Sequence, residues 1–282
     1  MKKRSPGKIM NRKPRTKKVR FIDRRAASML FAAFILLLVF AAGYHYRDAL
    51  AYYFSFKTDK MDEEDKLHAL RNFQVMKSHP DHVFGFDVSE YQGDIDWEQT
   101  DSVDDAFPLK FVFIRATAGK DAVDKRFIEN WIGSKKANIV HGAYHYYRPN
   151  ENSLEQAENF IKTVKLFKGD LPPVLDIEKL PEEQSLDSLK LGLKRWLNRV
   201  EKHYKVKPII YSGERYYEDF LKNEFSEYEF WIANYNFFVE EIEDDWLMWQ
   251  FTEKSRVPGI EGDVDINILN GSEVLLRQIT RK

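Results

Sequence analysis

Eight short apolar runs, rich in β-branched and aromatic residues, recur between residues 82 and 269. Segments with helical spacing of apolar residues separate the first five runs. Strands that alternate with helices pair in parallel, and eight of them in about 200 residues predict a closed, TIM-like (β/α) barrel. The last intervals are too short for full helices, so fewer helices are expected near the C-terminal strands. The runs are 82–89, 110–117, 139–147, 172–178, 207–212, 229–235, 246–251 and 263–269, and the expected helices are 125–137, 153–167, 186–204 and 214–221.

Polar side chains collect where these runs end. One polar residue at a strand end means little, because every strand must end somewhere, but its repetition along eight strands indicates a site. In a parallel barrel the carboxyl ends of all strands open on one face, where barrel enzymes carry their active sites. The residues concerned are Asp87, Arg115, Tyr144, His145, Asp176, Glu178, Tyr211, Asn234, Trp249, Gln250 and either Asp263 or Asp265.

The most specific local signal is the sequence Val174-Leu175-Asp176-Ile177-Glu178. Side chains alternate along a strand with period two, so Asp176 and Glu178 are expected to point together into the barrel mouth. Two adjacent carboxylates repel each other when both are ionised, which raises the pKa of at least one of them. A carboxyl group that stays protonated near neutral pH is a general acid for a glycosidic oxygen. Helix capping, or pairing with Lys179, is the structural alternative for an isolated pair.

Two histidines, His141 and His145, have a spacing that on a helix suits a metal. On a strand they share a face but lie about 13 Å apart, which is too far for joint ligation. We therefore expect no metal and interpret His145 as a hydrogen-bonding group beside the cleft. Tyr144 and Tyr146 are expected on the opposite face of that strand.

Several other classes of chemistry lack their motifs in this sequence. There is no Gly-rich phosphate loop, no G-x-S-x-G elbow and no H-E-x-x-H, which argues against nucleotide chemistry, serine hydrolysis and zincin proteolysis. The chain has no cysteine, which excludes disulfides and thiol nucleophiles. Aromatic residues are 15% of the chain, enough for a large core and a sugar-binding cleft.

An uncharged run of 19 residues occupies positions 26–44. At about 1.5 Å per helical residue, it can cross a hydrocarbon core of about 30 Å. Twelve basic residues precede the run and only Arg47 follows closely, so the positive-inside rule predicts a cytoplasmic N-terminus. Both the basic segment and the apolar run are long for a cleaved signal peptide, which favours a retained anchor. We expect a single-pass protein of the inner (cytoplasmic) membrane with its barrel outside the cytoplasm.

Charge divides the chain at the same place. Residues 1–25 hold 12 basic residues and one acid, whereas the remainder holds 32 basic and 44 acidic residues. Beside a membrane span, a basic tail serves as a topology signal and contacts anionic lipids, so no nucleic-acid partner is expected. The expected organisation is a basic cytoplasmic tail (1–25), a transmembrane signal anchor (26–44), a connector (45–80) and a barrel domain (81–282).

From about residue 82 to residue 277, the motifs and their order resemble glycoside hydrolase family 25, the Chalaropsis-type lysozymes or N-acetylmuramidases. Single motifs are weak, but their order is specific. Arg115 and Ala118 depart from the pattern, since the family often has Lys and Glu there. The matching motifs are Phe86-Asp87-Val88-Ser89, Gln92-Gly93, Ile95-Asp96-Trp97, Phe113-Ile114-Arg115-Ala116-Thr117, His141-Gly142-Ala143-Tyr144-His145-Tyr146, Pro173 to Glu178, Pro208 to Ser212, Trp231 to Tyr235, Trp249-Gln250-Phe251 and Asp263 to Asn267.

The resemblance implies cleavage of the β-1,4 bond from N-acetylmuramic acid to N-acetylglucosamine in peptidoglycan, without a metal or organic cofactor. Glycan strands are the implied partner, and a monomer is expected. Glu178 matches the family's proton donor and Asp176 its partner carboxylate, while Asp87 and Asp265 match the other two acids. The residues expected to bind substrate are Tyr144, Tyr211, Trp249 and Asn234.

Three alternatives stay open at this point. The barrel could be a non-catalytic module that binds peptidoglycan, although all four carboxylates of the family are present. It could be a metal-dependent glycan deacetylase that uses His141 and His145, or a hydrolase of a host or dietary glycan. The sequence also leaves open whether water, a carboxylate or the substrate's own N-acetyl oxygen attacks the anomeric carbon.

Overall fold

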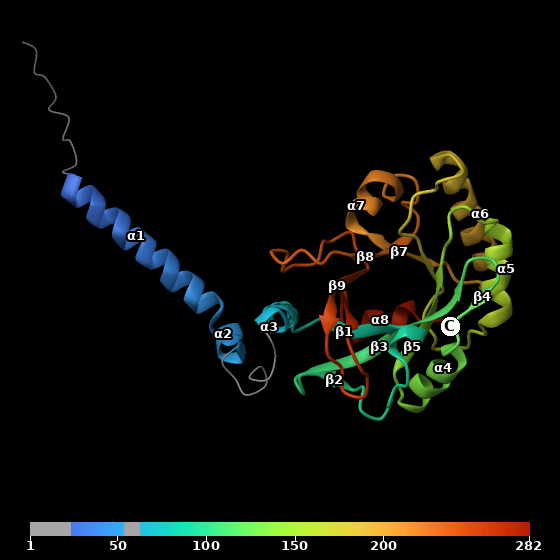
Figure 1. Cartoon of the computed structure of the whole chain (residues 1–282), viewed down its shortest axis with the longest axis horizontal. Coiled ribbons are helices and arrows are strands. Elements are labelled where there is room, and N and C mark those ends of the chain that lie inside the picture. The colour runs from blue at the N-terminus through green and yellow to red at the C-terminus, as the bar shows by residue number, and fades with distance from the viewer. Residues whose placement is uncertain (1–23, 54–62) are drawn as a thin grey trace, which may run out of the picture. The chain divides into compact units, whose positions relative to one another are not determined.

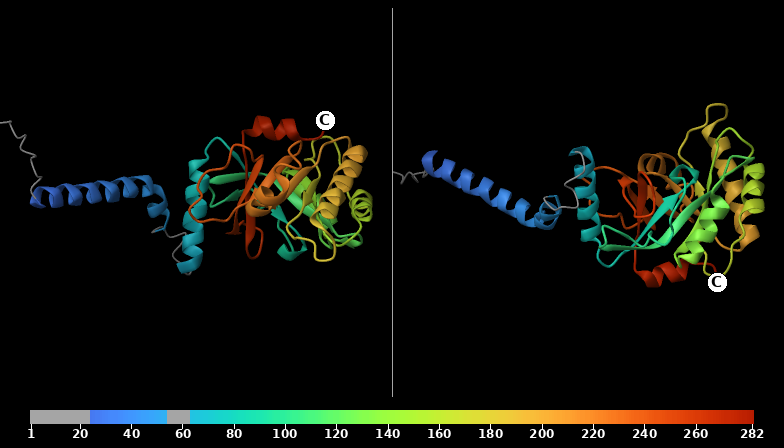
Figure 2. Two further views of the ribbon diagram at one scale, coloured as in Figure 1. Left: turned by 90° about the horizontal axis from the view of Figure 1, so that it is seen from above. Right: turned by 60° about the horizontal axis from the view of Figure 1, so that its bottom comes forward.

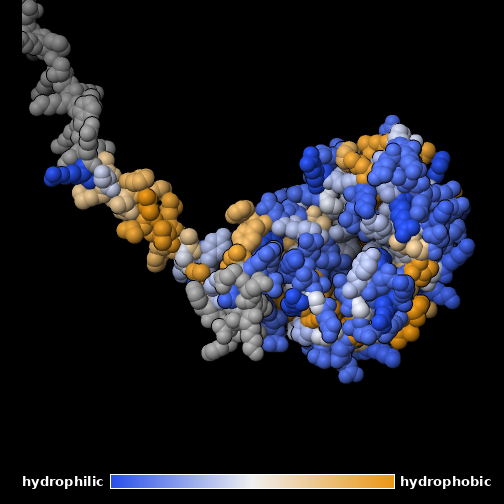
Figure 3. All heavy atoms as spheres, viewed as in Figure 1, coloured by the Kyte–Doolittle hydropathy of each residue, from blue (hydrophilic) through white to orange (hydrophobic). Residues whose placement is uncertain are grey.

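The computed structural model describes residues 24–53 and 63–282, in two compact units, Met1–Arg47 and Asp48–Lys282 (Figure 1). In the first unit, the described residues form helix α1 (Arg24–His45). Residues Arg25–His45 are long and apolar enough to cross a membrane, by length and composition. Figure 3 shows this helix as a continuous hydrophobic surface. Its length and composition therefore agree with the predicted span.

Eight strands of the second unit close into a barrel, as the alternation of apolar runs predicts (Figure 1). The closing contact joins the first long strand to the second, so the ring has no free edge. Two further two-residue strands, β2 (Ser102–Val103) and β4 (Ala122–Val123), pair with β3 outside the ring. The barrel strands are β1 (Val83–Val88), β3 (Phe107–Ala118), β5 (Val140–Tyr146), β6 (Val174–Asp176), β7 (Ile209–Gly213), β8 (Glu229–Ala233), β9 (Met248–Ser255) and β10 (Val264–Leu269).

The prediction of parallel strands throughout is wrong for β10. Strands β1 to β9 of the ring are parallel, but β10 runs antiparallel to both of its neighbours, β9 and β1. A parallel crossover needs a dozen or more residues, whereas only residues 256–263 connect β9 to β10. The chain therefore turns back as a hairpin, and the amino end of β10 lies beside the carboxyl ends of the other strands.

Helices cover the outside of the barrel mainly along β3, β5 and β9 (Figure 2). The longest, α6, begins at the N-cap Ser185, whose side chain accepts a hydrogen bond from the backbone N–H of Ser188. Its buried side chains Leu189, Trp196 and Val200 recur at helical spacing and face the barrel. The helices are α4 (Phe127–Lys136), α5 (Ser153–Thr163), α6 (Leu186–Tyr204), α7 (Glu214–Tyr216), which continues as a π-helix over Tyr217–Leu221, and α8 (Glu273–Ile279); a 3₁₀ turn covers Glu90–Gln92.

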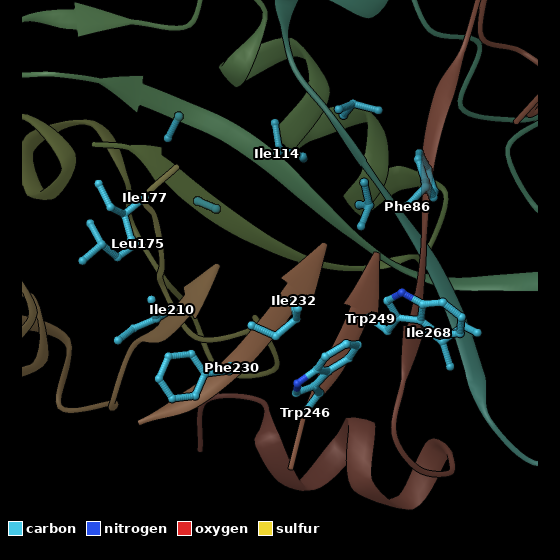
Figure 4. Close-up of a cluster of buried hydrophobic side chains, with 14 of the residues drawn as sticks. Phe86, Ile114, Leu175, Ile177, Ile210, Phe230, Ile232, Trp246, Trp249 and Ile268 are labelled. Atoms are coloured by element: carbon cyan, nitrogen blue, oxygen red, sulfur yellow. The ribbon is translucent and has the colours of Figure 1, made fainter. Parts of the chain in front are cut away.

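Two hydrophobic clusters fill the two sides of the barrel wall. Inside the ring, Phe113 stacks on Trp231 with 4.9 Å between ring centroids, and Leu276 of α8 packs in the same cluster. Outside the ring, alternate residues of the same strands form a second cluster with the helices, as Figure 4 shows for Ile210, Ile232 and Trp249. The parity of a residue along its strand therefore decides whether it faces the barrel axis or the outer layer.

Helix α3 (Glu63–Ser78) lies in the segment that the sequence analysis assigns to a connector, and it packs on the outer side of β9. The preceding short helix, α2 (Arg47–Tyr53), meets it through Tyr52, whose ring stacks on Phe73 at 4.6 Å. In α3, Val75 and Met76 are fully buried. Around β9, where the intervals between strands are short, α3 supplies an outer covering.

Candidate active site

Four carboxyl groups meet in one small pocket at the carboxyl-terminal face of the parallel strands. Asp87 lies near the end of β1, Asp176 is the last residue of β6, and Glu178 follows two residues later. Asp265 reaches the same pocket from the amino end of β10, because that strand is reversed. The pocket has a volume of about 90 Å³ and is lined by Asp87, Tyr144, Asp176, Glu178, Tyr211, Trp231, Gln250 and Asp265.

Asp87 and Asp265 form the first carboxyl pair. Asp87 Oδ2 accepts hydrogen bonds from Gln250 Nε2 at 2.7 Å and from Asn267 Nδ2 at 2.8 Å. Burial raises the pKa of Asp87 to about 6, against the opposing effect of these donors and of Asp265. Burial, together with the nearby charge of Asp87, raises the pKa of Asp265 further, to about 9. The pair thus shares one proton near neutral pH.

Asp176 and Glu178 form the second pair. Burial, followed by the charge of Glu178, raises the pKa of Asp176 well above its ordinary value. A hydrogen bond to Glu178 contributes in the same direction, since only a protonated Asp176 can donate it. Asp176 Oδ1 is buried and has no hydrogen-bond partner among the described residues, whereas Glu178 is exposed at the pocket. One carboxyl of this pair therefore keeps a proton in the protein interior while the other meets the solvent.

Tyrosine hydroxyls surround the carboxyl pairs. Tyr211 Oη donates to Gln250 Oε1 at 2.6 Å, and Tyr235 Oη donates to the same oxygen. Burial, followed by the charge of Asp87, raises the pKa of Tyr144 well above 10, so this hydroxyl stays neutral. Tyr144 and Tyr211 thus lie where the sequence predicted them, as neutral groups at the carboxylate cluster.

Trp249 and Asn234, which the sequence analysis also proposed as substrate-binding residues, do not line this pocket. Trp249 is fully buried in the outer hydrophobic cluster (Figure 4), and its Nε1 donates to the Asn234 carbonyl at 2.9 Å. Asn234 Nδ2 donates to Glu214 Oε2 at 2.9 Å, and its Oδ1 accepts from the backbone N–H of Asn236. Trp249 lies outside the pocket because side chains alternate along a strand: Gln250 faces the barrel axis, so its neighbour Trp249 faces outward.

The two histidines lie behind the barrel wall and away from the cleft. His145 is fully buried, with Nδ1 against Thr117 Oγ1 at 2.7 Å and Nε2 against Gln156 Oε1 at 3.2 Å. Burial lowers the pKa of His145 to about 3, so the ring is neutral. His141 contacts Ser134 Oγ at 3.2 Å and Asp170 Oδ1 at 3.3 Å. The interpretation of His145 as a cleft residue is therefore wrong, and Tyr144 and Tyr146 are indeed on the opposite face.

Two residues of the site, Trp231 and Asn267, were not named as site residues from the sequence, and Gln250 was named only among the polar residues at strand ends. Trp231 Nε1 donates to Asn267 Oδ1 at 2.8 Å, and Asn267 in turn holds Asp87. A signal for Asn267 was present, because it is two residues after Asp265 on the same strand and shares its face. For Gln250 the same parity argument applies only once the facing of Trp249 is known.

Arg115 lies in a groove of about 480 Å³ beside the pocket. Its Nε is 2.9 Å from Asp124 Oδ2, its Nη2 is 3.1 Å from Glu90 Oε1, and its guanidinium lies 4.6 Å from the ring centroid of Tyr91. Tyr146 and Lys179 line the same groove. Arg115 is thus held by two acids and an aromatic ring next to the carboxyl cluster.

A model of the Glycosyl hydrolases family 25 matches residues 86–260. The chain belongs to this family. It is therefore a glycoside hydrolase, and the matched segment holds Asp87, Asp176 and Glu178. Asp265 lies just beyond the match, on β10, which pairs with β1.

Relatives of known sequence and structure agree with family 25. The chain is 39% identical over 194 residues to the uncharacterized protein YegX of Escherichia coli strain K12, covering 67% of this chain and 70% of the relative. It is 32% identical over 209 residues to Lysozyme M1 of Streptomyces globisporus, covering 69% and 70%. Among solved structures, a family 25 glycosyl hydrolase from Bacillus anthracis superposes with a TM-score of 0.63 at 31% identity, covering 72% of this chain and 95% of that one. A bacterial lysozyme from Streptomyces coelicolor gives 0.63 at 29% identity, covering 70% and 96%.

Proposed function

We propose that this family 25 hydrolase is a lysozyme that cleaves the β-1,4 bond between N-acetylmuramic acid and N-acetylglucosamine in peptidoglycan. The observation that carries the proposal is the convergence of Asp87, Asp176, Glu178 and Asp265 on one pocket. The similarity to Lysozyme M1 and to the Streptomyces coelicolor lysozyme supports the choice of substrate.

In this proposal Glu178 is the proton donor. It is exposed at the pocket, so a glycosidic oxygen that approaches from solvent meets it first. The pKa of its buried neighbour Asp176 is raised, so Asp176 keeps a proton and shares a hydrogen bond with Glu178. General acid catalysis of glycoside cleavage requires a carboxyl group that is protonated near neutral pH. Cleavage breaks the bond from the anomeric carbon to the leaving oxygen, which takes the proton of Glu178. A water molecule then supplies the new hydroxyl group of the anomeric carbon and returns a proton to the site.

The pair of Asp87 and Asp265 stabilises charge in the proposed mechanism. The transition state of glycoside cleavage resembles an oxocarbenium ion, which carries positive charge near the anomeric carbon. Asp87 is the more acidic member of its pair, with donors from Gln250 and Asn267 fixing its carboxylate. A fixed negative charge stabilises this transition state without a change of orientation during the reaction.

We further propose that α1 anchors the protein in the inner membrane, with residues 1–25 in the cytoplasm, residues 45–80 as the connecting segment and the barrel (81–282) outside. The length and composition of Arg25–His45 and the basic residues before it support this topology. Peptidoglycan lies outside that membrane, so this orientation brings the pocket to its substrate. Protease accessibility in intact spheroplasts tests it: digestion of the barrel by external protease is expected, and full protection would contradict the topology.

The decisive experiment compares the full chain with its Glu178→Gln variant, both in detergent, on purified peptidoglycan. Mass spectrometry then identifies the reducing ends that are released. We expect N-acetylmuramic acid at the new reducing ends for the wild type and a loss of nearly all release in the variant. N-acetylglucosamine at the new ends would overturn the assigned bond, and near-normal release by the variant would overturn the role of Glu178.

The same assay separates the alternatives. Tight binding of intact glycan by both proteins would favour a non-catalytic binding module. Release of acetate, abolished by a chelator, would favour a deacetylase. The positions of His141 and His145 behind the barrel wall argue against that second alternative, since both ring nitrogens of each contact other side chains.

A further inference from the structure

Helix α3 lies outside the segment that matches family 25, yet it is part of the same compact unit as the barrel. It packs on β9, and its residues Arg71, Asn72, Val75 and Met76 are all buried. Arg71 is 6% exposed, although a charged side chain is seldom buried without dedicated partners. The partners of Arg71 therefore indicate what the helix does.

Arg71 binds three backbone carbonyls on two separate segments. Its Nη1 donates to the Phe251 carbonyl on β9 at 2.5 Å. Its Nη2 donates to the carbonyls of Asn236 at 3.0 Å and Val239 at 3.3 Å, in the loop that follows β8. The guanidinium also lies 5.9 Å from the ring centroid of Trp249 and 6.0 Å from that of Phe251. One planar cation thus fixes β9 and the loop after β8 relative to each other.

These two segments carry the residues that orient Asp87. Tyr235 immediately precedes Asn236 in the loop, and Gln250 immediately precedes Phe251 on β9. The Tyr235 hydroxyl donates to Gln250 Oε1, and Gln250 Nε2 donates to Asp87 Oδ2 at 2.7 Å. A continuous series of hydrogen bonds and chain neighbours therefore runs from Arg71 to a carboxylate of the pocket.

We propose that Arg71 is a positioning residue for hydrolysis: from a helix outside the family segment, it holds Tyr235 and Gln250 so that Gln250 keeps Asp87 ionised and oriented. The inference rests on the proposed function, in which Asp87 stabilises the transition state. Residues that orient a reacting group without touching the substrate commonly change its ionisation and its rate contribution together.

The charges around Arg71 allow a pH profile to report on the pocket. Burial lowers the pKa of Arg71 to about 10, and the charge of Glu240 opposes that shift. Arg71 therefore keeps its charge over the range in which Asp87 ionises. Glu241 lies near His79 rather than on the guanidinium, with 3.6 Å between His79 Nε2 and Glu241 Oε2. Loss of the Gln250 donor removes an interaction that lowers the Asp87 pKa, so a displaced Gln250 raises that pKa.

The test uses the full chain in detergent and measures kcat and KM for peptidoglycan cleavage from about pH 4 to about pH 9. For Arg71→Met we expect kcat to fall about tenfold with KM changed less than about twofold, and the acid limb to move up by about half a pH unit. The matched control is Asn72→Ala, which removes the bond from Asn72 Nδ2 to the Lys254 carbonyl (2.8 Å) on the same helix. It is expected to lower the melting temperature and to leave the pH profile unchanged.

Arg71→Met with a lowered melting temperature but a wild-type kcat and acid limb would overturn the proposal, as would an equal shift of the acid limb in Asn72→Ala. If Arg71→Met does not fold, Tyr235→Phe tests the same connection from within the loop: an upward shift of the acid limb supports it, and an unchanged limb overturns it. Asp87→Asn serves as the separate check on the proposed function. Normal activity of that variant would overturn the role of Asp87 itself, whereas an inactive Asp87→Asn beside an unaffected Arg71→Met overturns the role of Arg71 alone.

Discussion

Asp87 and Asp265 are direct cross-strand partners on the antiparallel neighbours β1 and β10. Near neutral pH they share one proton, which we assign to Asp265 because its pKa is the higher of the two. Asp265 thus acts on Asp87 as a neutral hydrogen-bond donor. An asparagine can replace a neutral donor but cannot replace a carboxylate.

We therefore expect Asp265→Asn to keep kcat/KM within about tenfold of the wild type near pH 7, and Asp87→Asn to lose about a thousandfold. The measurement is the initial rate of reducing-end release by the two purified variants. Equal losses in both variants would contradict the assignment of the proton to Asp265.

The pH dependence of kcat/KM should be bell-shaped. Burial raises the pKa of Asp87 to about 6 and that of Asp265 to about 9. Activity is expected to rise through about pH 6, as Asp87 becomes charged, and to fall towards pH 9, as the shared proton is lost. A stopped assay over this range gives both limbs of the profile. A rate that stays flat from acid to neutral pH would rule out Asp87 as the group behind the acid limb.

Asp176→Asn should make the fold more stable while it lowers activity. The pKa of Asp176 is raised by burial, so the unfolded chain releases this proton at a lower pH than the folded chain. This carboxyl therefore destabilises the fold progressively as the pH rises above the ordinary aspartate pKa of about 4.

We expect the stability gain of Asp176→Asn over the wild type to grow between about pH 4.5 and about pH 7.5, reaching about 1 kcal/mol or more. Urea unfolding of both proteins at the two pH values measures it. Glu178→Gln removes a neighbouring charge that helps to raise the pKa of Asp176, so it should give a smaller gain with the same pH dependence.

Trp249→Phe should affect folding and leave catalysis intact. The ring is fully buried in the outer cluster, and the substitution removes its hydrogen bond to the Asn234 carbonyl. We expect a loss of about 1–3 kcal/mol of unfolding free energy. The value of kcat/KM per folded molecule should stay within about threefold of the wild type. A large rise in KM without a loss of stability would return Trp249 to the substrate-binding residues.

The family 25 strands could be predicted from the sequence because each apolar run fits one strand of a buried sheet, and the parity of Asp176 and Glu178 followed from their spacing. Parity alone does not say which face looks inward. At Trp249-Gln250 and at His145, the orientation depends on the register of neighbouring strands and on the helices that cover them. The antiparallel direction of β10 could not be predicted from the apolar pattern either, since an apolar run does not show in which direction its strand runs in the sheet.

The role of α3 was harder still to predict. Its sequence is polar on average, and the buried Arg71 looks like any surface arginine until the carbonyls of Asn236, Val239 and Phe251 are brought around it. Every residue has a backbone carbonyl, so the sequence does not show which carbonyls bind a distant side chain. Only the assembled fold connects this arginine to the pocket.

The reversed direction of β10 constrains how the enzyme can vary during evolution. Asp87 and Asp176 lie on strands that precede rim loops, and Glu178 comes only two residues after β6, so insertions further along those loops leave the positions of these acids untouched. Asp265 instead comes directly after the rim loop 256–263, two residues into its strand. A change in the length of that loop shifts the start of β10, and a slip of one residue turns Asp265 to the outer face. The length of this loop is therefore more tightly constrained than that of the loops after β1 and β6.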